Sequence, residues 1–203
     1  DRTYAKQQLE IFLNFLHQLE RTAFQPPIRH AANSAALIEI PASHLDMVRP
    51  GIATYGLNPS NEINKGKAML KPVMSLKSRI IHIKKVSAGF NVSYGITYQT
   101  QKPTTIATVP VGYADGLNRL FSSSGRMMVH GQIVPIIGRV CMDLTMLDVG
   151  RIENVKIGDE VVVFGQQGEK TLTIDEMAAA PKGQAITKGI EIAGRMIKRI
   201  HEE

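Results

Sequence analysis

The stretch RMMVHGQIVPIIG, residues 126–138, decides how the larger part of this chain folds. Two strand-like apolar runs flank His130-Gly131, which is a plausible hairpin connection. Similar runs lie on both sides of this stretch, separated by glycines or short polar turns. Short strands at this spacing predict an antiparallel sandwich or barrel. These runs are VMSLKSRIIHIKKV (73–86), TTIATVPVGYA (104–114), CMDLTMLDV (141–149) and DEVVVFG (159–165).

Two further signals lie towards the end of the chain. GQQG (165–168) predicts a second hairpin connection. TLTIDEMA (171–178) opens a helix, because Thr173 and Glu176 stand in capping-box register. We therefore expect residues 69–203 to form a β-rich domain.

The first part of the chain follows another pattern. Apolar residues recur at three- and four-residue spacing over residues 3–20, which predicts an amphipathic helix. PPIRHAANSAALIEI (26–40) predicts a short strand at residues 28–31, then a short helix capped by Asn33 or Ser34.

MVRPGIATYGL (47–57) again resembles a strand that runs into a turn marked by glycines. Alternation of strand, polar turn and helix is typical of an α/β domain. The predicted fold is therefore an α/β domain over residues 1–68, joined to the β-rich domain.

The composition limits the class of function. With 43% hydrophobic and 21% charged residues, the 203-residue chain is typical of a soluble globular protein. The net charge of +6 comes from lysines and arginines interleaved with apolar residues, so a solvated basic face is favoured over nucleic-acid binding. No run is long enough to span a membrane, and no signal peptide is visible. The single cysteine, Cys141, fits a reducing, cytoplasmic compartment. The start, DRTYAKQQLE, lacks methionine and is typical of a fragment.

Two motifs of the α/β part are candidates for binding an anion. HAANSAA (30–36) and VRPGIATYG (48–56) place small residues where a strand gives way to a turn or helix. Ser34, Gly51 and Ile52 could form a phosphate cradle, although a simple helix cap is the alternative. Arg49 could pair with a phosphate, contact a cofactor ring nitrogen or form a surface ion pair.

VSYGITY (92–98) raises a different possibility. Glycine weakens the interior of a strand, so Ser93, Tyr94 and Gly95 indicate an exposed phenol held at a bend. Such a phenol is either a packing anchor or an acid–base group.

PVGYADGLNR (110–119) and GRVCMDL (138–144) are too polar and glycine-rich for simple β structure. Cys141 is more readily interpreted as an inert thiol than as a nucleophile. The histidines show no metal-ligand spacing, so no metal site is expected. The candidate residues in these motifs are Tyr113, Asp115, Arg119, Arg139, Met142 and Asp143.

Five motifs in this order and spacing resemble the C-terminal part of alanine racemase over roughly residues 1–178. They are HAANSAA, VRPGIATYGL, VSYGITY, VPVGYADG and IIGRVCMD. The resemblance implies the end of a TIM-like (β/α)₈ barrel followed by a β domain. It also implies pyridoxal 5′-phosphate as cofactor, and a head-to-tail homodimer whose active sites combine the barrel of one subunit with the β domain of the other. The reaction would interconvert L- and D-alanine through a cofactor aldimine and two bases, supplying D-alanine for peptidoglycan.

The resemblance also assigns roles to residues. Ser34, Gly51 and Ile52 would contact the phosphate, and Arg49 would face the pyridine nitrogen, which an arginine cannot readily protonate. Tyr94 would be the catalytic base on one face of the substrate, although an ordinary tyrosine has a pKa near 10, so nearby positive charge must stabilise its phenolate. The remaining matches are Tyr113, Arg119 and Arg139 at the substrate entrance, and the backbone of Met142 at the substrate carboxylate.

Two departures qualify these expectations. The Schiff-base lysine, a second pocket arginine and the histidine that assists the tyrosine would lie before Asp1, and no lysine of this chain matches that motif. In the best register, Thr187 replaces a tyrosine that touches the phosphate in the family.

Racemisation of another amino acid such as serine is one alternative. A non-catalytic module that only dimerises and completes a pocket is another.

Overall fold

A computed structural model describes residues 2–22, 24–60 and 62–179 of the chain. The chain divides into two compact units, Asp1–Val73 and Met74–Glu203, which we call unit 1 and unit 2. Thr187 lies outside the described residues. Among the helices that are described, none is both long and apolar enough to cross a bilayer.

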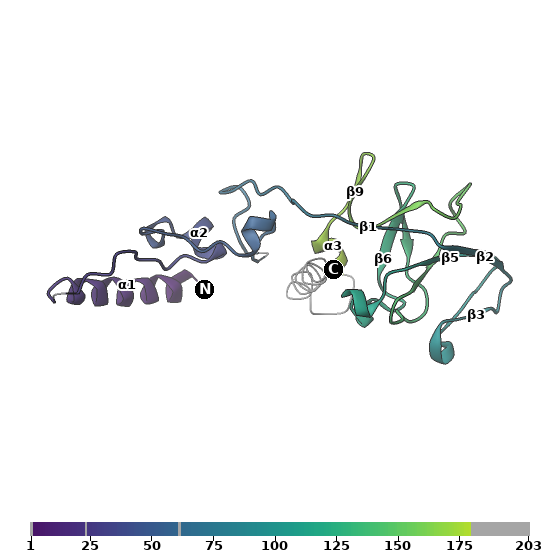
Figure 1. Cartoon of the computed structure of the whole chain (residues 1–203), viewed down its shortest axis with the longest axis horizontal. Helices are drawn as coiled ribbons and strands as arrows, with labels where there is room; N and C mark the ends of the chain where they lie inside the picture. Colours follow the sequence, from purple (N-terminus) through teal and green to yellow (C-terminus); the bar gives the residue numbers. More distant parts are fainter. Residues whose placement is uncertain (1, 23, 61, 180–203) are drawn as a thin grey trace. The chain divides into compact units, whose positions relative to one another are not determined.

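Unit 1 contains α-helices and 3₁₀ turns, and no strand among its described residues (Figure 1). The predicted amphipathic helix is confirmed as α1 (Arg2–Leu19), and Asn33 caps the short helix α2 (Ser34–Glu39) by accepting from the Ala36 N–H at 2.9 Å. The two predicted strands of this part are reduced to a single parallel bridge between His30 and Met47. Two 3₁₀ turns complete the unit, η1 (Pro41–Ser43) and η2 (Ile52–Tyr55).

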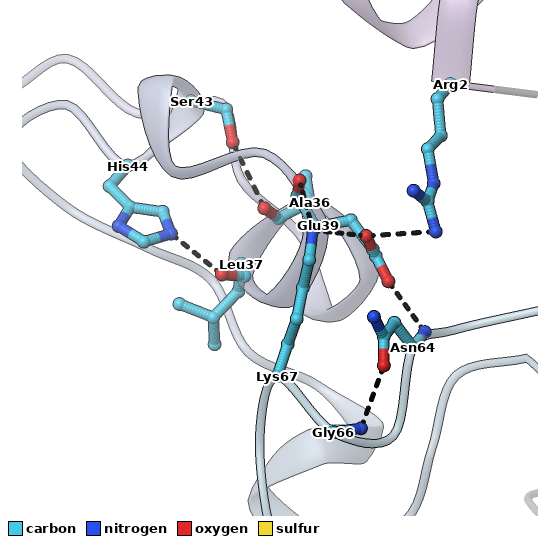
Figure 2. Close-up of polar contacts among 9 residues, drawn as sticks. All are labelled: Arg2, Ala36, Leu37, Glu39, Ser43, His44, Asn64, Gly66 and Lys67. Atoms are coloured by element: carbon cyan, nitrogen blue, oxygen red, sulfur yellow. Dashed lines mark hydrogen bonds and ion pairs between the residues drawn. The ribbon is translucent and has the colours of Figure 1, made fainter.

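The carboxylate of Glu39, at the end of α2, joins three segments of unit 1 (Figure 2). Arg2 Nη2 and Lys67 Nζ lie 3.1 and 2.8 Å from Glu39 Oε2, and the Asn64 N–H donates to Oε1 at 2.7 Å. The side chain of Glu39 is only 6% exposed. The hydrogen bond from Lys67, the Asn64 N–H and the charge of Arg2 together lower the pKa of Glu39. The ionised carboxylate therefore fastens α1 and the loop at residues 62–67 to α2.

Unit 2 is built from antiparallel strand pairs, as the sequence predicts. One sheet has the order β1-β9-β6-β7 with β10 added to β9, a second has the order β2-β5-β8, and β3 pairs with β4 alone. In Figure 1 the β3 hairpin projects from one end of the unit. The strands are β1 (Leu76–Arg79), β2 (His82–Val86), β3 (Asn91–Val92), β4 (Tyr98–Gln99), β5 (Thr104–Val109), β6 (Arg126–Val129), β7 (Gln132–Pro135), β8 (Thr145–Asp148), β9 (Glu160–Gln167) and β10 (Lys170–Leu172).

The hairpin predicted from residues 126–138 is confirmed. β6 and β7 pair from Arg126↔Pro135 to Val129↔Gln132, and the two residues between them have φ of 49° and 70°. Positive φ at both turn residues gives the turn the twist that antiparallel strands require. The core of this sheet lies in β6 and in its neighbour β9, whose Val161, Val162 and Val163 are fully buried.

The second hairpin lies later than the sequence predicts. Gly165, Gln166 and Gln167 belong to β9, and the turn is at residues 168–169. Gly165 serves another purpose, since a Cβ added there would lie 2.4 Å from the Cβ of Ser75. This glycine allows β9 to approach a neighbouring segment closely and does not form the turn.

The helix α3 (Ile174–Ala179) begins at the predicted capping box. The Glu176 N–H donates to Thr173 Oγ1 at 3.0 Å, and the Thr173 N–H donates to Glu176 Oε2 at 2.8 Å. The N–H and the hydroxyl of Thr173, which both donate to Glu176 Oε2, lower the pKa of Glu176. The cap fixes where the helix starts and so directs Met177 into the core of unit 2.

Candidate functional site

The predicted cradle of unit 1 forms around the buried hydroxyl of Ser34, in the first turn of α2. Ser34 Oγ accepts hydrogen bonds from the Gly51 N–H at 2.9 Å and from the Ala53 N–H at 3.2 Å. The hydroxyl proton is not used in these two bonds and can donate to a further acceptor. The structure thus joins Ser34 and Gly51 directly, and the Gly51 N–H is used to hold the serine.

The space over this hydroxyl suits a small anion. A Cβ added at Gly51 would stand 3.9 Å from Ser34 Oγ, with no other atom within 4 Å, so glycine keeps this space open. The backbone N–H groups of Ile52 and Ser34 donate to no residue among those the structure describes. A hydroxyl and backbone N–H groups at a turn are the donors that bind phosphate in many proteins.

Arg49 lies beside this cradle and contacts a histidine that the sequence does not single out as a site residue. Arg49 Nη1 lies 2.5 Å from His30 Nδ1 and 3.4 Å from the His30 carbonyl oxygen. Since a guanidinium can only donate, His30 Nδ1 accepts and its ring proton is on Nε2. The guanidinium retains other N–H groups for a ligand. Residues 30 and 49 meet because their segments run in parallel and share the bridge between His30 and Met47. The one sequence signal for His30 is its place at the start of the motif HAANSAA.

In unit 2, Tyr94 opens the short 3₁₀ turn η3 (Tyr94–Ile96) between β3 and β4. Its neighbours Ser93, Gly95 and Ile96 have φ of 64°, 71° and 51°, so the bend predicted at this point is confirmed. The Tyr94 side chain is 74% exposed. The backbone thus presents the phenol to the outside and does not use it as a packing anchor within this unit.

Arg139 supports this turn from the following loop. The guanidinium of Arg139 lies against Gly95, where an added Cβ would be 3.3 Å from Arg139 Cζ. Ser93 Oγ donates to the Arg139 carbonyl at 2.8 Å and lies 3.5 Å from the half-buried Cys141 Sγ. The arrangement places a permanent positive charge at the turn that carries Tyr94.

The loop at residues 110–119 packs against the same segment. The N–H groups of Tyr113 and Ala114 donate to the carbonyls of Cys141 and Met142, each at 2.9 Å. Arg119 covers the ring of Tyr113, with its Cζ 5.6 Å from the ring centroid. These contacts thus link the turn that carries Tyr94 to the loop at residues 138–144, and that loop to the loop that carries Tyr113 and Arg119.

An added methyl group at Gly112 should disrupt this packing. Its Cβ would stand 2.1 Å from the Met142 oxygen and 2.5 Å from the Cys141 oxygen. No side-chain rotation can relieve a clash with backbone, so Gly112→Ala should lower the free energy of unfolding by about 3 kcal/mol or more. Urea denaturation measures this loss.

The control for that experiment is Gly89→Ala. An added Cβ there meets no atom within 4 Å, and only the φ of 79° is unfavourable. The expected loss is about 1–2 kcal/mol. Equal losses in the two variants would mean that the loops at residues 110–119 and 138–144 are not held this closely.

The site residues therefore form one cluster in each unit. Unit 1 offers an anion cradle and a guanidinium, and unit 2 offers an exposed phenol, two arginines and an exposed methionine. The Met142 N–H donates to no residue in the described part of the chain, so it is open to a ligand acceptor. No group of three or more metal-ligating side chains comes together within residues 2–22, 24–60 and 62–179.

Comparison with known proteins relates both units to one family. A family model described as "Alanine racemase, C-terminal domain" matches residues 73–203, and one described as "Alanine racemase, N-terminal domain" matches residues 1–59. The chain is 53% identical over 196 residues to an alanine racemase of Desulfosudis oleivorans, covering 97% of this chain and 50% of that protein. An alanine racemase of Methanococcus maripaludis is 48% identical over 176 residues, covering 87% of this chain and 47% of that protein. The chain thus spans about half the length of these relatives.

Solved structures give the same result. The alanine racemase of Bacillus anthracis with bound L-Ala-P superimposes with a TM-score of 0.87 at 36% identity, covering 97% of this chain and 49% of that one. An alanine racemase of Clostridium difficile 630 in complex with cycloserine superimposes with a TM-score of 0.85 at 35% identity, covering 95% and 50%. These likenesses confirm the predicted fold class, the end of a barrel followed by a β domain.

Proposed function

We propose, from the premise that the chain belongs to the alanine racemase family, that the whole protein interconverts L- and D-alanine with pyridoxal 5′-phosphate. One observation carries the proposal. The described residues form an anion cradle with an adjacent guanidinium in unit 1, and an exposed phenol beside a guanidinium in unit 2. A phosphorylated cofactor with a ring nitrogen needs the first set, and proton transfer at an amino-acid Cα needs the second.

The unit 1 residues fit the cofactor by the chemistry of their donors. The hydroxyl of Ser34 and the N–H of Ile52 would bind the phosphate, over the space that Gly51 keeps open. Arg49 would face the ring nitrogen. When bound, the cofactor makes the Cα proton of an amino acid acidic by drawing electrons into its ring. A guanidinium cannot give a proton to the ring nitrogen. Arg49 would therefore keep the ring a weaker electron acceptor, which favours reprotonation at Cα over side reactions.

Tyr94 would act on one face of the substrate: it would remove the Cα proton from one enantiomer, and in the reverse direction it would deliver a proton to that same face. The positive charge of Arg139 lies at the turn that carries Tyr94. The base for the opposite face would be a lysine from the other half of the whole protein. The Met142 N–H would bind the substrate carboxylate, and Tyr113, Arg119 and Arg139 would line the entrance. The B. anthracis relative binds L-Ala-P, which supports alanine as the substrate.

We also propose that the whole protein is a cytoplasmic homodimer that shares its active sites between subunits and supplies D-alanine for peptidoglycan. Exposed Tyr94 and Ile96 support the dimer, since two large side chains left exposed on the same short turn favour a protein contact. Polarimetry of the whole protein with L-alanine and with L-serine tests the reaction and the substrate together. The proposal is supported if the optical rotation of an L-alanine solution is lost only when pyridoxal phosphate is present. Faster racemisation of serine would support the alternative substrate.

The 203-residue chain purified by itself should not racemise alanine, even with added pyridoxal phosphate. None of its lysines matches the one that the family uses to hold the cofactor and to move the second proton, so one face of the substrate would lack its base. Isotope exchange at Cα in both enantiomers is the sensitive measurement, with the whole protein as the positive control. Measurable turnover by the chain alone would contradict the roles proposed for Tyr94 and for the lysine of the other half.

A further inference from the structure

An ion pair outside the proposed site clasps the two segments that carry its unit 1 residues. Arg29 Nε and Nη2 bind Asp46 Oδ2 and Oδ1 at 2.7 and 3.0 Å. The Arg29 N–H also donates to Asp46 Oδ2 at 2.8 Å, and the Arg29 carbonyl accepts from the Asp46 N–H at 3.0 Å. Backbone and side chain of both residues thus take part, which fixes their relative position more firmly than a single surface ion pair does.

The clasp is the first of a series of contacts in one register. Arg29 meets Asp46, His30 bridges to Met47, the Ala32 carbonyl accepts from the Arg49 N–H at 2.8 Å, and Ser34 Oγ accepts from the Gly51 N–H. Each pair is 17 residues apart. The clasp therefore stands at the start of the same parallel alignment that ends at the cradle.

The two segments form no continuous β-ladder among the described residues. In that part of the chain they share one isolated bridge, His30↔Met47, so their alignment depends on contacts between individual pairs of residues such as the clasp. A slip of one residue would move Arg49 away from His30 and the Gly51 N–H away from Ser34 Oγ. The bond between Arg49 and His30 and the cradle at Ser34 both depend on avoiding that slip.

The charge state of the clasp suits a permanent structural role. The hydrogen bonds from the Arg29 side chain and N–H lower the pKa of Asp46 to about 2. The carboxylate thus stays ionised at any pH near neutrality. The side chains are 41% and 37% exposed, so the clasp acts mainly by geometry and adds little to global stability.

We propose that Arg29 and Asp46 are positioning residues that hold residues 29–34 in register with residues 46–51, and thereby place Arg49 and Ser34 for the cofactor. The effect on cofactor binding rests on the proposed function, whereas the effect on the register does not. Neither residue touches the proposed cofactor contacts directly in the described structure.

Amide hydrogen exchange tests the register independently of activity. In Asp46→Ala, the amides of Arg49 and Gly51 should exchange faster than in the parent whole protein, because their acceptors Ala32 and Ser34 would no longer be held opposite them. Asp46→Asn, which keeps an acceptor for the Arg29 N–H, should show a smaller increase. It also serves if Asp46→Ala fails to fold. Unchanged exchange at both amides in Asp46→Asn and Asp46→Ala would overturn the proposal.

Binding of pyridoxal 5′-phosphate gives the second readout. Its apparent Kd should rise by roughly 10- to 100-fold in Asp46→Ala, the scale of losses for residues that orient direct ligands. Arg29→Ala should lose less, since Asp46 would still accept from the backbone N–H of residue 29. The matched control is Lys77→Ala, which removes a similarly exposed ion pair with Glu160 in unit 2 and should leave the Kd unchanged. Equal losses in Asp46→Ala and Lys77→Ala would also overturn the proposal.

The two proposals fail in different ways. A parent protein that neither binds pyridoxal phosphate nor racemises alanine would overturn the proposed function, and the exchange rates would still decide the register role. A parent that racemises alanine while Asp46→Ala binds the cofactor as tightly would overturn the positioning role alone.

Discussion

Replacing Tyr94 with phenylalanine in the whole protein should lower kcat by roughly 10²-fold or more, the usual scale for a lost general base. The fold and the cofactor content should change little. Tyr94 is 74% exposed, so removing its oxygen leaves no buried partner unsatisfied within this unit. Steady-state kinetics, cofactor absorbance and thermal unfolding measure the three expectations.

The loss should also be unequal between the enantiomers. We expect Tyr94 to serve one face of the substrate and a lysine from the other half of the protein to serve the opposite face. In Tyr94→Phe, exchange of the Cα proton with solvent should therefore survive better from the enantiomer whose proton the lysine removes. The overall equilibrium cannot shift, so single-turnover or isotope-exchange measurements are needed. Equal residual exchange from both enantiomers would make Tyr94 a packing residue of the assembled protein.

Tyr98→Phe is the matched control for this experiment, since it removes the same oxygen four positions away. Tyr98 packs against the core cluster of unit 2 that contains Val86 and Ile106. Burial, with the charge of Asp148, raises the pKa of Tyr98, which disfavours the phenolate that a base would need. Its replacement should leave kcat near the parent value.

The features that the sequence predicts correctly depend on residues close together in the chain. The turn at His130-Gly131 and the capping box at Thr173 and Glu176 are set by local backbone and side-chain chemistry. The bend at Tyr94 is of the same kind. Gly165 is a case that the sequence alone does not decide, because a glycine is equally expected in a turn and where two backbone segments pack closely. The Ser75 side chain and backbone that it meets are far away in sequence.

The candidate site follows the same division. The sequence motifs predict that Ser34 and Gly51 belong to one site. They do not predict that the Gly51 N–H donates to the Ser34 hydroxyl and is therefore not available to a ligand. The contacts of His30 with Arg49 and of Arg29 with Asp46 depend on which residues of two segments lie opposite each other. This register depends on pairs of residues that are 17 apart, and neither segment alone indicates which residues pair.

Reversing the charge at Arg49 should be about as damaging as losing the phenol. A carboxylate in Arg49→Glu could accept a hydrogen bond from a protonated ring nitrogen, and it could not donate to His30 Nδ1 as the guanidinium does. Racemisation should fall by orders of magnitude, on the order of 10²-fold or more as for other groups that tune a cofactor or a proton transfer. Release of pyruvate from alanine should rise relative to racemisation, because a protonated ring draws electrons more strongly and favours transamination.

Two further variants separate this effect from a general loss of charge. Arg151→Glu makes the same reversal at an exposed turn of unit 2 and should keep the parent kinetics. Arg49→Lys keeps the positive charge but offers a single donor group, and an ammonium can yield a proton more readily than a guanidinium, so an intermediate loss is expected. Coupled pyruvate and polarimetric assays of the three variants measure both reactions. Kinetics like the parent's in Arg49→Glu would remove Arg49 from the cofactor site, and with it the reason for His30 to stand where it does.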